Sequence, residues 1–423
     1  MEITEKKLKS SRIIYIIEAA IEYFISILVA GSFLATITNE LGFSDSLTGI
    51  LSSIISLGCL FQLLSMFYRK AKVKRLVVIF SIINQLLFML LYVIPLTRVD
   101  GKVKTAIFVF MIVLAYLTYN FVHPKKIKWL MSLVDDHKRG GFTAVKEMVS
   151  LISGIIFTFL MGIVADYFTA MGNIKGAFVV FAIVIFTLNI LHTLTMVLTV
   201  EPETESTLRK EKFLNSIKEL FKNKDVLKIT ILFVIYYVSH YISIPFYGTY
   251  EIKELGFSLT FVSTITMIGS ISRIAVSVFW GKYADKRSFA KMLEKCFIFL
   301  MLSQICVAFA VPANGKIMLI LYRVLNGVAM GGINSALTNL IFDYVPSEKR
   351  ADSIAITQAV AGVTGFLTTL CISPVISIIQ ANGNKIFGIP MYAQQFVSIL
   401  GEAVILFAIL YVRLAIQKRR AKI

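Results

Sequence analysis

Apolar runs of roughly 20 residues, each long enough to cross a bilayer as a helix, recur about twelve times along this 423-residue chain. The first three span residues 13–37, 47–67 and 76–96. A segment inside lipid must satisfy its own backbone hydrogen bonds, which favours helices over other structures. The sequence therefore predicts an all-α membrane protein with twelve transmembrane helices.

Composition agrees with this class. The chain is 57% hydrophobic and 16% charged, with a mean hydropathy of +0.79, whereas soluble domains are roughly 45–50% apolar and 25% charged. The first apolar run contains Glu18 and Glu22, and it is too long and too acidic for a cleaved signal peptide. We expect it to remain as the first helix.

The net charge of +18 is concentrated in every second gap between the apolar runs. Of the 43 Lys and Arg residues, 34 lie in such gaps and seven lie in the intervening ones. The basic gaps are 1–12, 68–75, 125–146, 209–228, 282–295, 349–350 and 413–423. Because cytoplasmic loops collect Lys and Arg, we expect a multi-pass protein of the cell membrane with both termini in the cytoplasm. The charge then faces anionic lipid, and no nucleic-acid partner is expected.

The four cysteines and four histidines show no spacing typical of disulfides or metal ligands. We therefore expect neither a metal nor a cofactor.

Two internal correspondences suggest a duplication. The segment Glu-Leu-Gly-Phe-Ser at 40–44 recurs at 254–258, and a second, looser match later in each half has a nearly equal offset. We expect two pseudo-symmetric six-helix bundles, 1–198 and 226–423, joined by a cytoplasmic linker, 199–225, with an interfacial helix around 213–221. Parallel repeats with a site between them are the arrangement of many secondary transporters.

The octapeptide Trp-Gly-Lys-Tyr-Ala-Asp-Lys-Arg at 280–287 resembles the Gly-x-x-x-Asp-Arg/Lys signature of the major facilitator superfamily. The resemblance extends to Leu-Gly-Phe-Ser before helices 2 and 8, to residues 346–350 before helix 11, and to the twelve-helix pattern of the whole chain. It implies the fold of that superfamily. The equivalent segment of the first half, 67–73, lacks both the glycine and the acid.

In the superfamily, the acid of this signature is thought to lock one conformation. The resemblance therefore assigns Asp285 to a gate, together with Gly281 and Arg287. Arg273 in helix 8 and Glu147 at the start of helix 5 are further gate candidates.

The resemblance also implies that helices 1, 4, 7 and 10 line a cavity. Each of them carries polar residues at steps of three and four, which place side chains on one helix face. Beyond the acids of helix 1, the substrate-cavity candidates are Tyr116, Tyr119, Asn120, Tyr236, His240, Tyr247, Arg323, Asn326 and Asn334.

Glu22 and Glu18 are the candidates for proton coupling. A charged side chain at the centre of a membrane helix costs roughly 2.5–3.5 kcal/mol on insertion scales, so it usually faces water, a partner or a substrate. Two carboxylates one turn apart disfavour joint ionisation, which suits the uptake and release of a proton. Arg273 and Arg323 are the expected counter-charges, and either could instead bind an anionic group of the substrate.

These features predict a secondary active transporter that moves a small organic solute by alternating access. The expected coupling ion is a proton in preference to sodium, and a monomer is expected. An uncoupled facilitator or a drug or metabolite exporter of the same fold is the nearest alternative. A non-transporting receptor or a membrane-embedded enzyme is the alternative from another class, but no nucleophile–base pair, metal cluster or phosphate-binding glycine loop supports an enzyme.

Overall fold

The computed structural model describes residues 5–64, 72–135, 138–202, 224–344 and 350–417. Two compact units divide the chain. The first comprises residues 1–43, 61–208 and 258–263, and the second comprises residues 44–60, 209–257 and 264–423.

The first half of the chain contains α1 (Glu5–Leu28), α2 (Gly31–Glu40), α3 (Asp45–Leu64), α4 (Lys74–Val93), the 3-10 turn η2 (Ile94–Leu96), α5 (Gly101–Met131), α6 (Arg139–Ala170) and α7 (Ile174–Leu198). The second half contains α9 (Lys224–Ser243), η4 (Ile244–Phe246), α10 (Tyr247–Thr249), η5 (Tyr250–Glu254), α11 (Leu259–Lys286), α12 (Phe289–Ala308), α13 (Gly315–Tyr344), α14 (Arg350–Ala381), β1 (Lys385–Ile386), β2 (Ile389–Pro390), α15 (Ala393–Tyr411) and η7 (Val412–Gln417). The strands β1 and β2 form one antiparallel hairpin.

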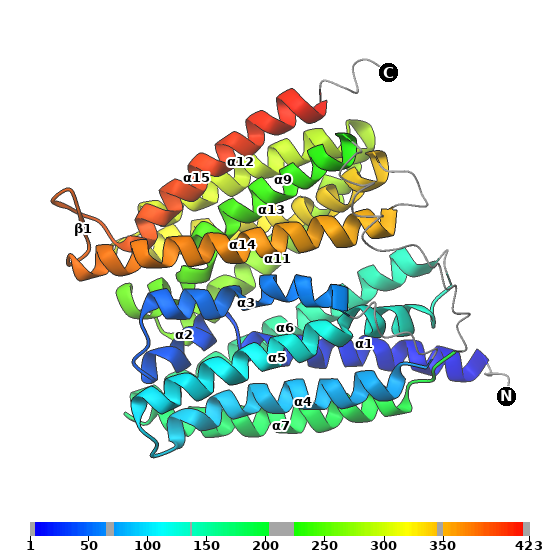
Figure 1. The fold of residues 1–423 in the computed structure, drawn as a ribbon, viewed down its shortest axis with the longest axis horizontal. Helices are drawn as coiled ribbons and strands as arrows, with labels where there is room; N and C mark the ends of the chain where they lie inside the picture. The colour runs from blue at the N-terminus through cyan, green and yellow to red at the C-terminus, as the bar shows by residue number, and fades with distance from the viewer. Residues whose placement is uncertain (1–4, 65–71, 136–137, 203–223, 345–349, 418–423) are drawn as a thin grey trace. The chain divides into compact units, whose positions relative to one another are not determined.

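The same packing pattern occurs in both units. In the first, α1 packs against α6 and α7, and α4 packs against α5 and α7. In the second, α9 packs against α14 and α15, and α12 packs against α13 and α15 (Figure 1). Each pair in one unit has its counterpart six transmembrane helices later in the chain, which is the pattern expected of a duplicated six-helix bundle.

The repeated Glu-Leu-Gly-Phe-Ser segment is a turn between two helices in both copies. Its glycine, Gly42 or Gly256, has a φ of 73° or 66°, a left-handed conformation that glycine adopts without steric cost and that commonly ends helices. Its serine, Ser44 or Ser258, accepts the backbone N–H three residues further on at 3.2 Å. That bond caps the next helix, so the repeated sequence ends one helix and begins the next.

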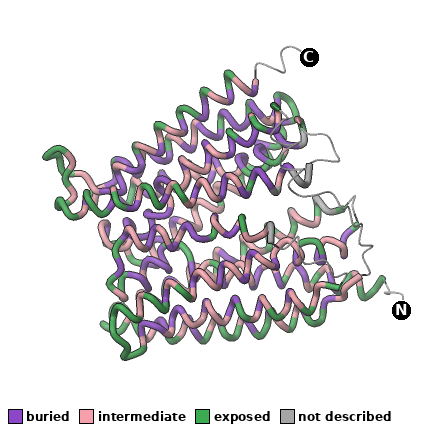
Figure 2. The backbone as a smooth tube through the Cα atoms, viewed as in Figure 1, coloured by how far each residue is buried: buried purple, intermediate pink, exposed green. Residues whose placement is uncertain are grey.

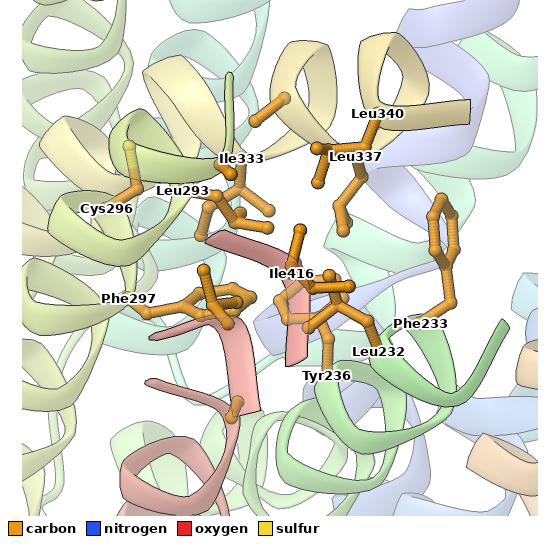
Figure 3. Close-up of a cluster of buried hydrophobic side chains, with 14 of the residues drawn as sticks. Leu232, Phe233, Tyr236, Leu293, Cys296, Phe297, Ile333, Leu337, Leu340 and Ile416 are labelled. Atoms are coloured by element: carbon orange, nitrogen blue, oxygen red, sulfur yellow. The ribbon is translucent and has the colours of Figure 1, made fainter. Parts of the chain in front are cut away.

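The largest described core lies in the second unit. Side chains of α9, α12, α13 and η7 converge in it, among them Leu232, Phe297, Ile333 and Ile416 (Figure 3). Figure 2 shows buried residues on the faces where helices meet and exposed ones on the outward faces. Many outward side chains are large and apolar, including Phe407 at 57% exposure. Exposed apolar side chains spread over whole helices are what lipid, rather than water, requires.

Among the described residues, ten helices are long and apolar enough to span a membrane, or eleven when α1 and α2, bent by 40° at their junction, count as one span. The remaining helix, α12, has 20 residues but carries three charged residues, Lys291, Glu294 and Lys295, near its start, more than the other spans contain in their apolar stretches. The predicted all-α membrane fold with two six-helix bundles is confirmed.

The two compact units do not coincide with the halves of the sequence. Residues 44–60 of α3 belong to the second unit, and residues 258–263 at the start of α11 belong to the first. The boundaries 1–198, 199–225 and 226–423 therefore stay a prediction. The interfacial helix expected around 213–221 lies outside the described residues.

A close contact between α11 and α13 gives a first test of the packing. A Cβ at Gly327 would overlap the carbonyl oxygen of Gly269 and lie 3.0 Å from the Cβ of Ser272. We expect Gly327→Ala to destabilise the protein by about 1–3 kcal/mol, the usual cost of overpacking. Thermal unfolding in detergent measures this as a lower Tm.

The matched control is Gly281→Ala on α11, where a Cβ would meet nothing within 4 Å. Alanine there should raise the stability by about 0.5–1 kcal/mol through helix propensity. Equal Tm values for the two variants would contradict the close approach of α11 and α13.

Candidate functional site

Glu18 and Glu22 of α1 share one cation in the first unit. The Nζ of Lys126, near the end of α5, lies 2.8 Å from Oε1 of Glu22 and forms an ion pair with Oε1 of Glu18 as well. The side chains of Glu18 and Lys126 are only 1% and 5% exposed, whereas that of Glu22 is 26% exposed. Residues four apart lie on the same face of a helix, so both carboxylates reach the same ammonium group. We name Glu18, Glu22, Lys126 and His192 the acid–lysine cluster.

His192 of α7 belongs to this cluster through a hydrogen bond to Glu18. Its Nε2 lies 2.7 Å from Oε1 of Glu18, and its Nδ1 lies 2.9 Å from Nε2 of Gln85 on α4. Asn189 donates to Oε1 of Gln85 at 3.0 Å, which leaves the Gln85 amide nitrogen as the donor to Nδ1. Nε2 of His192 therefore carries the ring hydrogen and donates a hydrogen bond to Oε1 of Glu18, and Nζ of Lys126 lies 3.5 Å from the same nitrogen.

The cluster holds more negative than positive charge. With His192 neutral, two carboxylates face one ammonium. Oε2 of Glu18 is buried and has no hydrogen-bond partner among the described residues. An uncompensated charge in a poorly solvated site is costly. Binding of one proton would make the cluster neutral and remove this cost. Glu22 is the more exposed of the two acids.

Lys126 is the residue that sequence reasoning missed. The sequence assigned 125–146 to a cytoplasmic gap, but α5 continues through Pro124 to Met131. Trp129 and Leu130 are buried in the last turn, and Trp129 donates to the carbonyl of Val200 at 3.0 Å. That packing keeps the helix intact where the apolar run ends and buries Lys126. It was therefore wrong to count Lys126 as a residue of the cytoplasmic gap.

The other candidates of the first unit lie on α5, close to the cluster in sequence. Asn120 is buried, donates to the carbonyl of Tyr116 at 2.9 Å and accepts from Gln62 at 3.1 Å. Tyr119 is partly exposed and lies against the ring of His123, with 4.8 Å between centroids. Tyr116 is 7% exposed and packs edge-on against Phe88. Among these, Tyr119 is the aromatic side chain most available to a solute.

The second unit contains a separate buried ion pair. Arg323 of α13 donates to Oε1 of Glu251 at 2.6 Å, and the guanidinium lies 5.3 Å from the centre of the Tyr322 ring. Glu251 is 2% exposed and lies in η5, a π-helical turn that continues the α9 span. The sequence suggested Arg323 or Arg273 as the counter-charge of Glu22. In the structure, Lys126 is the cation bound to Glu22, and Glu251 is the acid bound to Arg323.

The aromatic candidates of this unit have different surroundings. Tyr236 lies in the core of Figure 3, 5.8 Å from the Phe297 ring in a stacked arrangement, which favours a packing role. Tyr247 is buried, and its hydroxyl is 2.8 Å from Oγ of Ser398. His240 is partly exposed between Tyr236 and Tyr241.

Asn326 and Asn334 lie on α13, the helix of Arg323. Asn326 is partly exposed and Asn334 is exposed. Both remain candidates for hydrogen bonds to a solute.

The donor atoms of Glu18, Glu22 and His192 lie within 4.8 Å of one another, a spacing that a metal ion could use. The ammonium of Lys126 is bonded to both carboxylates in that place. A positive charge is therefore already supplied by the chain itself, and the geometry favours an ion pair over a metal centre.

Comparison with known proteins places this geometry in a family. The Major Facilitator Superfamily profile matches residues 17–414, which is nearly the whole chain. The chain belongs to the major facilitator superfamily. As a member of this superfamily, it is a membrane transporter and not an enzyme.

Solved structures similar to this superfamily member share its fold at low sequence identity. The nucleoside transporter NupG matches with a TM-score of 0.70 at 12% identity, over 95% of this chain and 98% of that one. A D-xylose-proton symporter matches with a TM-score of 0.68 at 13% identity, over 94% and 96%. The POT family transporter PepTSo matches with a TM-score of 0.69 at 10% identity, over 97% and 98%. No curated protein matches the chain.

The signature residues of this superfamily member lie at the end of α11. Gly281, Asp285 and Arg287 are exposed, and Arg273, two turns earlier, is partly exposed. No carboxylate of the described residues lies within 4.0 Å of the Arg273 guanidinium. Glu147 is exposed on α6. The gate roles of these five residues stay a prediction.

The Arg323–Glu251 pair provides a second test. Glu251→Gln removes the carboxylate that pairs with Arg323, whose side chain is 23% exposed. Breaking a fully buried pair typically costs about 3–5 kcal/mol, so we expect a smaller loss here. We expect Glu251→Gln to have a lower Tm in detergent than the wild type.

The double variant Glu251→Gln with Arg323→Met removes both charges and should recover most of the loss, because contacting residues couple strongly. Two additive single losses would show that the residues do not act as a pair.

Proposed function

We propose that this chain is a secondary active transporter that moves a small organic solute by alternating access and couples that movement to a proton. The observation that carries the proposal is the acid–lysine cluster, in which one carboxylate exceeds the available positive charge. A buried acid in a transmembrane helix is by default a functional residue. A cluster that gains neutrality with one proton suits coupling to protons.

The two acids have different parts in this proposal. Glu18 is fixed between Lys126 and His192 and is almost fully buried, so it serves as the permanent counter-charge of the lysine. Glu22 is the proton carrier, because its side chain is partly exposed and bonds to Lys126 alone among the contacts described for it. When Glu22 is protonated, Lys126 and Glu18 form a neutral pair. When Glu22 is ionised, the cluster carries a surplus negative charge, which the binding of a proton removes before the solute-loaded transporter reorients.

A proton is favoured over sodium because the place a cation would take between these carboxylates is held by the Lys126 ammonium. A uniport facilitator would have no need for a surplus carboxylate in its bundle. The charge distribution supports a cell-membrane protein with both termini in the cytoplasm, and we propose that it acts as a monomer.

The proposed solute-contacting residues are Tyr119 and Asn120 in the first unit and His240, Asn326 and Asn334 in the second. Proteins of similar fold are named for nucleosides and for D-xylose, so small neutral polar solutes of these kinds are sensible first candidates. Gly281, Asp285, Arg287, Arg273 and Glu147 are proposed as the gate.

Counterflow in proteoliposomes tests the proposal. Vesicles are loaded with an unlabelled candidate, and uptake of its labelled form is followed; carrier transport predicts a transient accumulation inside. A solute that binds without counterflow would indicate a receptor, and a chemically altered solute would indicate an enzyme. Either result would overturn the proposed function.

A further inference from the structure

The hairpin β1–β2, between α14 and α15, presents an apolar tip. Phe387 and Gly388 form its two-residue turn with φ values of 51° and 81°. Positive φ at both central positions is the type I′ geometry, in which Asn-Gly and Asp-Gly are the favoured pairs. A bulky side chain in the left-handed region is unusual and sterically costly. Even so, Phe387 is fully exposed, at 101%, and Ile389 is 62% exposed.

The hairpin is fixed to the second unit. Ile386 packs against the buried cluster of Ile242, Phe246, Ile376, Ile379, Ala393 and Val397. The backbone of Met391 donates to Asn384 at 2.8 Å, and that of Asn384 donates to Ile379 at 3.0 Å. Because the side chain of Ile386 is held against this cluster, the side chain of Phe387, the next residue, is held away from it. The exposure of Phe387 therefore follows from the backbone geometry, and the fold gains nothing from a phenyl ring at this position.

The surroundings of the tip indicate what covers it. The hairpin lies between two helices that are long and apolar enough to span a membrane, the first ending at Ala381 and the next beginning at Ala393. It therefore lies at the membrane-surface end of both spans. Figure 2 shows the hairpin exposed along most of its length, beyond the ends of these helices.

The charge of the hairpin also favours lipid. Lys385 is exposed, and residues 382–392 contain no acid. A basic residue beside exposed apolar side chains combines attraction to phosphate-bearing headgroups with burial in the acyl boundary. The neighbouring helix α15 also carries exposed apolar side chains, among them Ile399 at 42% and Phe407 at 57% exposure.

We propose that the hairpin is a lipid anchor: Phe387 and Ile389 insert at the boundary between headgroups and acyl chains, and Lys385 binds headgroup phosphate. The anchor holds the ends of α14 and α15 at a fixed depth. The occupant of this surface is the bilayer, not a protein partner.

Tryptophan fluorescence tests the anchor directly. Phe387→Trp is reconstituted in vesicles of phosphatidylcholine and phosphatidylglycerol, and the wild-type signal, from the buried Trp129 and Trp280, is subtracted. We expect a blue-shifted emission that is quenched by lipids with a spin label near the headgroup and is protected from aqueous iodide. Quenching by iodide alone would overturn the anchor. Emission that changes with protein density, and not with labelled lipid, would indicate a second copy and would overturn it as well.

A second variant separates anchoring from folding. Asparagine tolerates the left-handed conformation, so Phe387→Asn should keep or raise the Tm in detergent, where the anchor is not used. In vesicles the same variant should lose the extra thermal stability that phosphatidylglycerol confers on the wild type. Ile386→Asn is the control and should lower the Tm in both media. A fall in the detergent Tm for Phe387→Asn comparable to that for Ile386→Asn would show that the phenyl ring serves the fold.

Discussion

Lys126→Met is expected to abolish transport and to destabilise the protein by about 3–5 kcal/mol, the usual cost of removing one partner of a buried ion pair. The lysine forms ion pairs with two carboxylates at once, so its loss leaves Glu18 and Glu22 close together without a cation. Thermal unfolding in detergent measures the stability, and counterflow measures the transport.

Lys128→Met is the matched control, because Lys128 is exposed on the same helix and should tolerate the change. Adding Glu18→Gln to Lys126→Met returns the net charge of the cluster to its original value and should recover part of the lost stability. A Lys126→Met protein as stable as the wild type would show that the ammonium is not the counter-charge of these acids.

Glu22→Gln is expected to eliminate concentrative uptake while preserving solute exchange. Glutamine imitates the protonated acid, so the transporter can still reorient with solute bound, but it cannot release a proton. A pH gradient of one unit is worth 1.36 kcal/mol per proton, and it therefore supports at most about tenfold accumulation for one proton per solute. The wild type should approach this ratio, and the variant should stop at equal concentrations inside and outside.

Glu5→Gln, on an exposed position of the same helix, is the control and should accumulate solute normally. Loss of both accumulation and exchange in Glu22→Gln would assign Glu22 to solute binding. Normal accumulation would remove it from coupling altogether.

The sequence predicted the fold because hydrophobic length and charge placement are local properties. Twelve apolar runs and the duplicated turn could be recognised without knowing any contact. The gap boundaries were less certain, because a helix can continue beyond its apolar run where tertiary packing supports it. In α5, the packing of Trp129 and Leu130 supports such a continuation.

Lys126 and Glu251, which the sequence analysis missed, each lie one helical turn beyond a row of polar residues that is visible in the sequence. His123 is followed three residues later by Lys126, and Tyr247 is followed four residues later by Glu251. Extending each pattern by one turn would have found them. The partners Glu18 and Arg323 were recognised as unusual charges, but their pairing depends on which helices pack together. His192 and Gln85 lie outside the four helices expected to line the cavity, and a polar pair at a helix contact has no distinctive local spacing.

Proton movement measured together with solute transport tests the central claim most directly. Proteoliposomes in a weakly buffered medium with a pH-sensitive dye receive a solute identified by counterflow. We expect the medium to become alkaline by about one proton per solute taken up by the wild type, and to stay unchanged with Glu22→Gln. Solute uptake by the wild type without proton movement, or proton movement that persists in Glu22→Gln, would contradict coupling through the acid–lysine cluster.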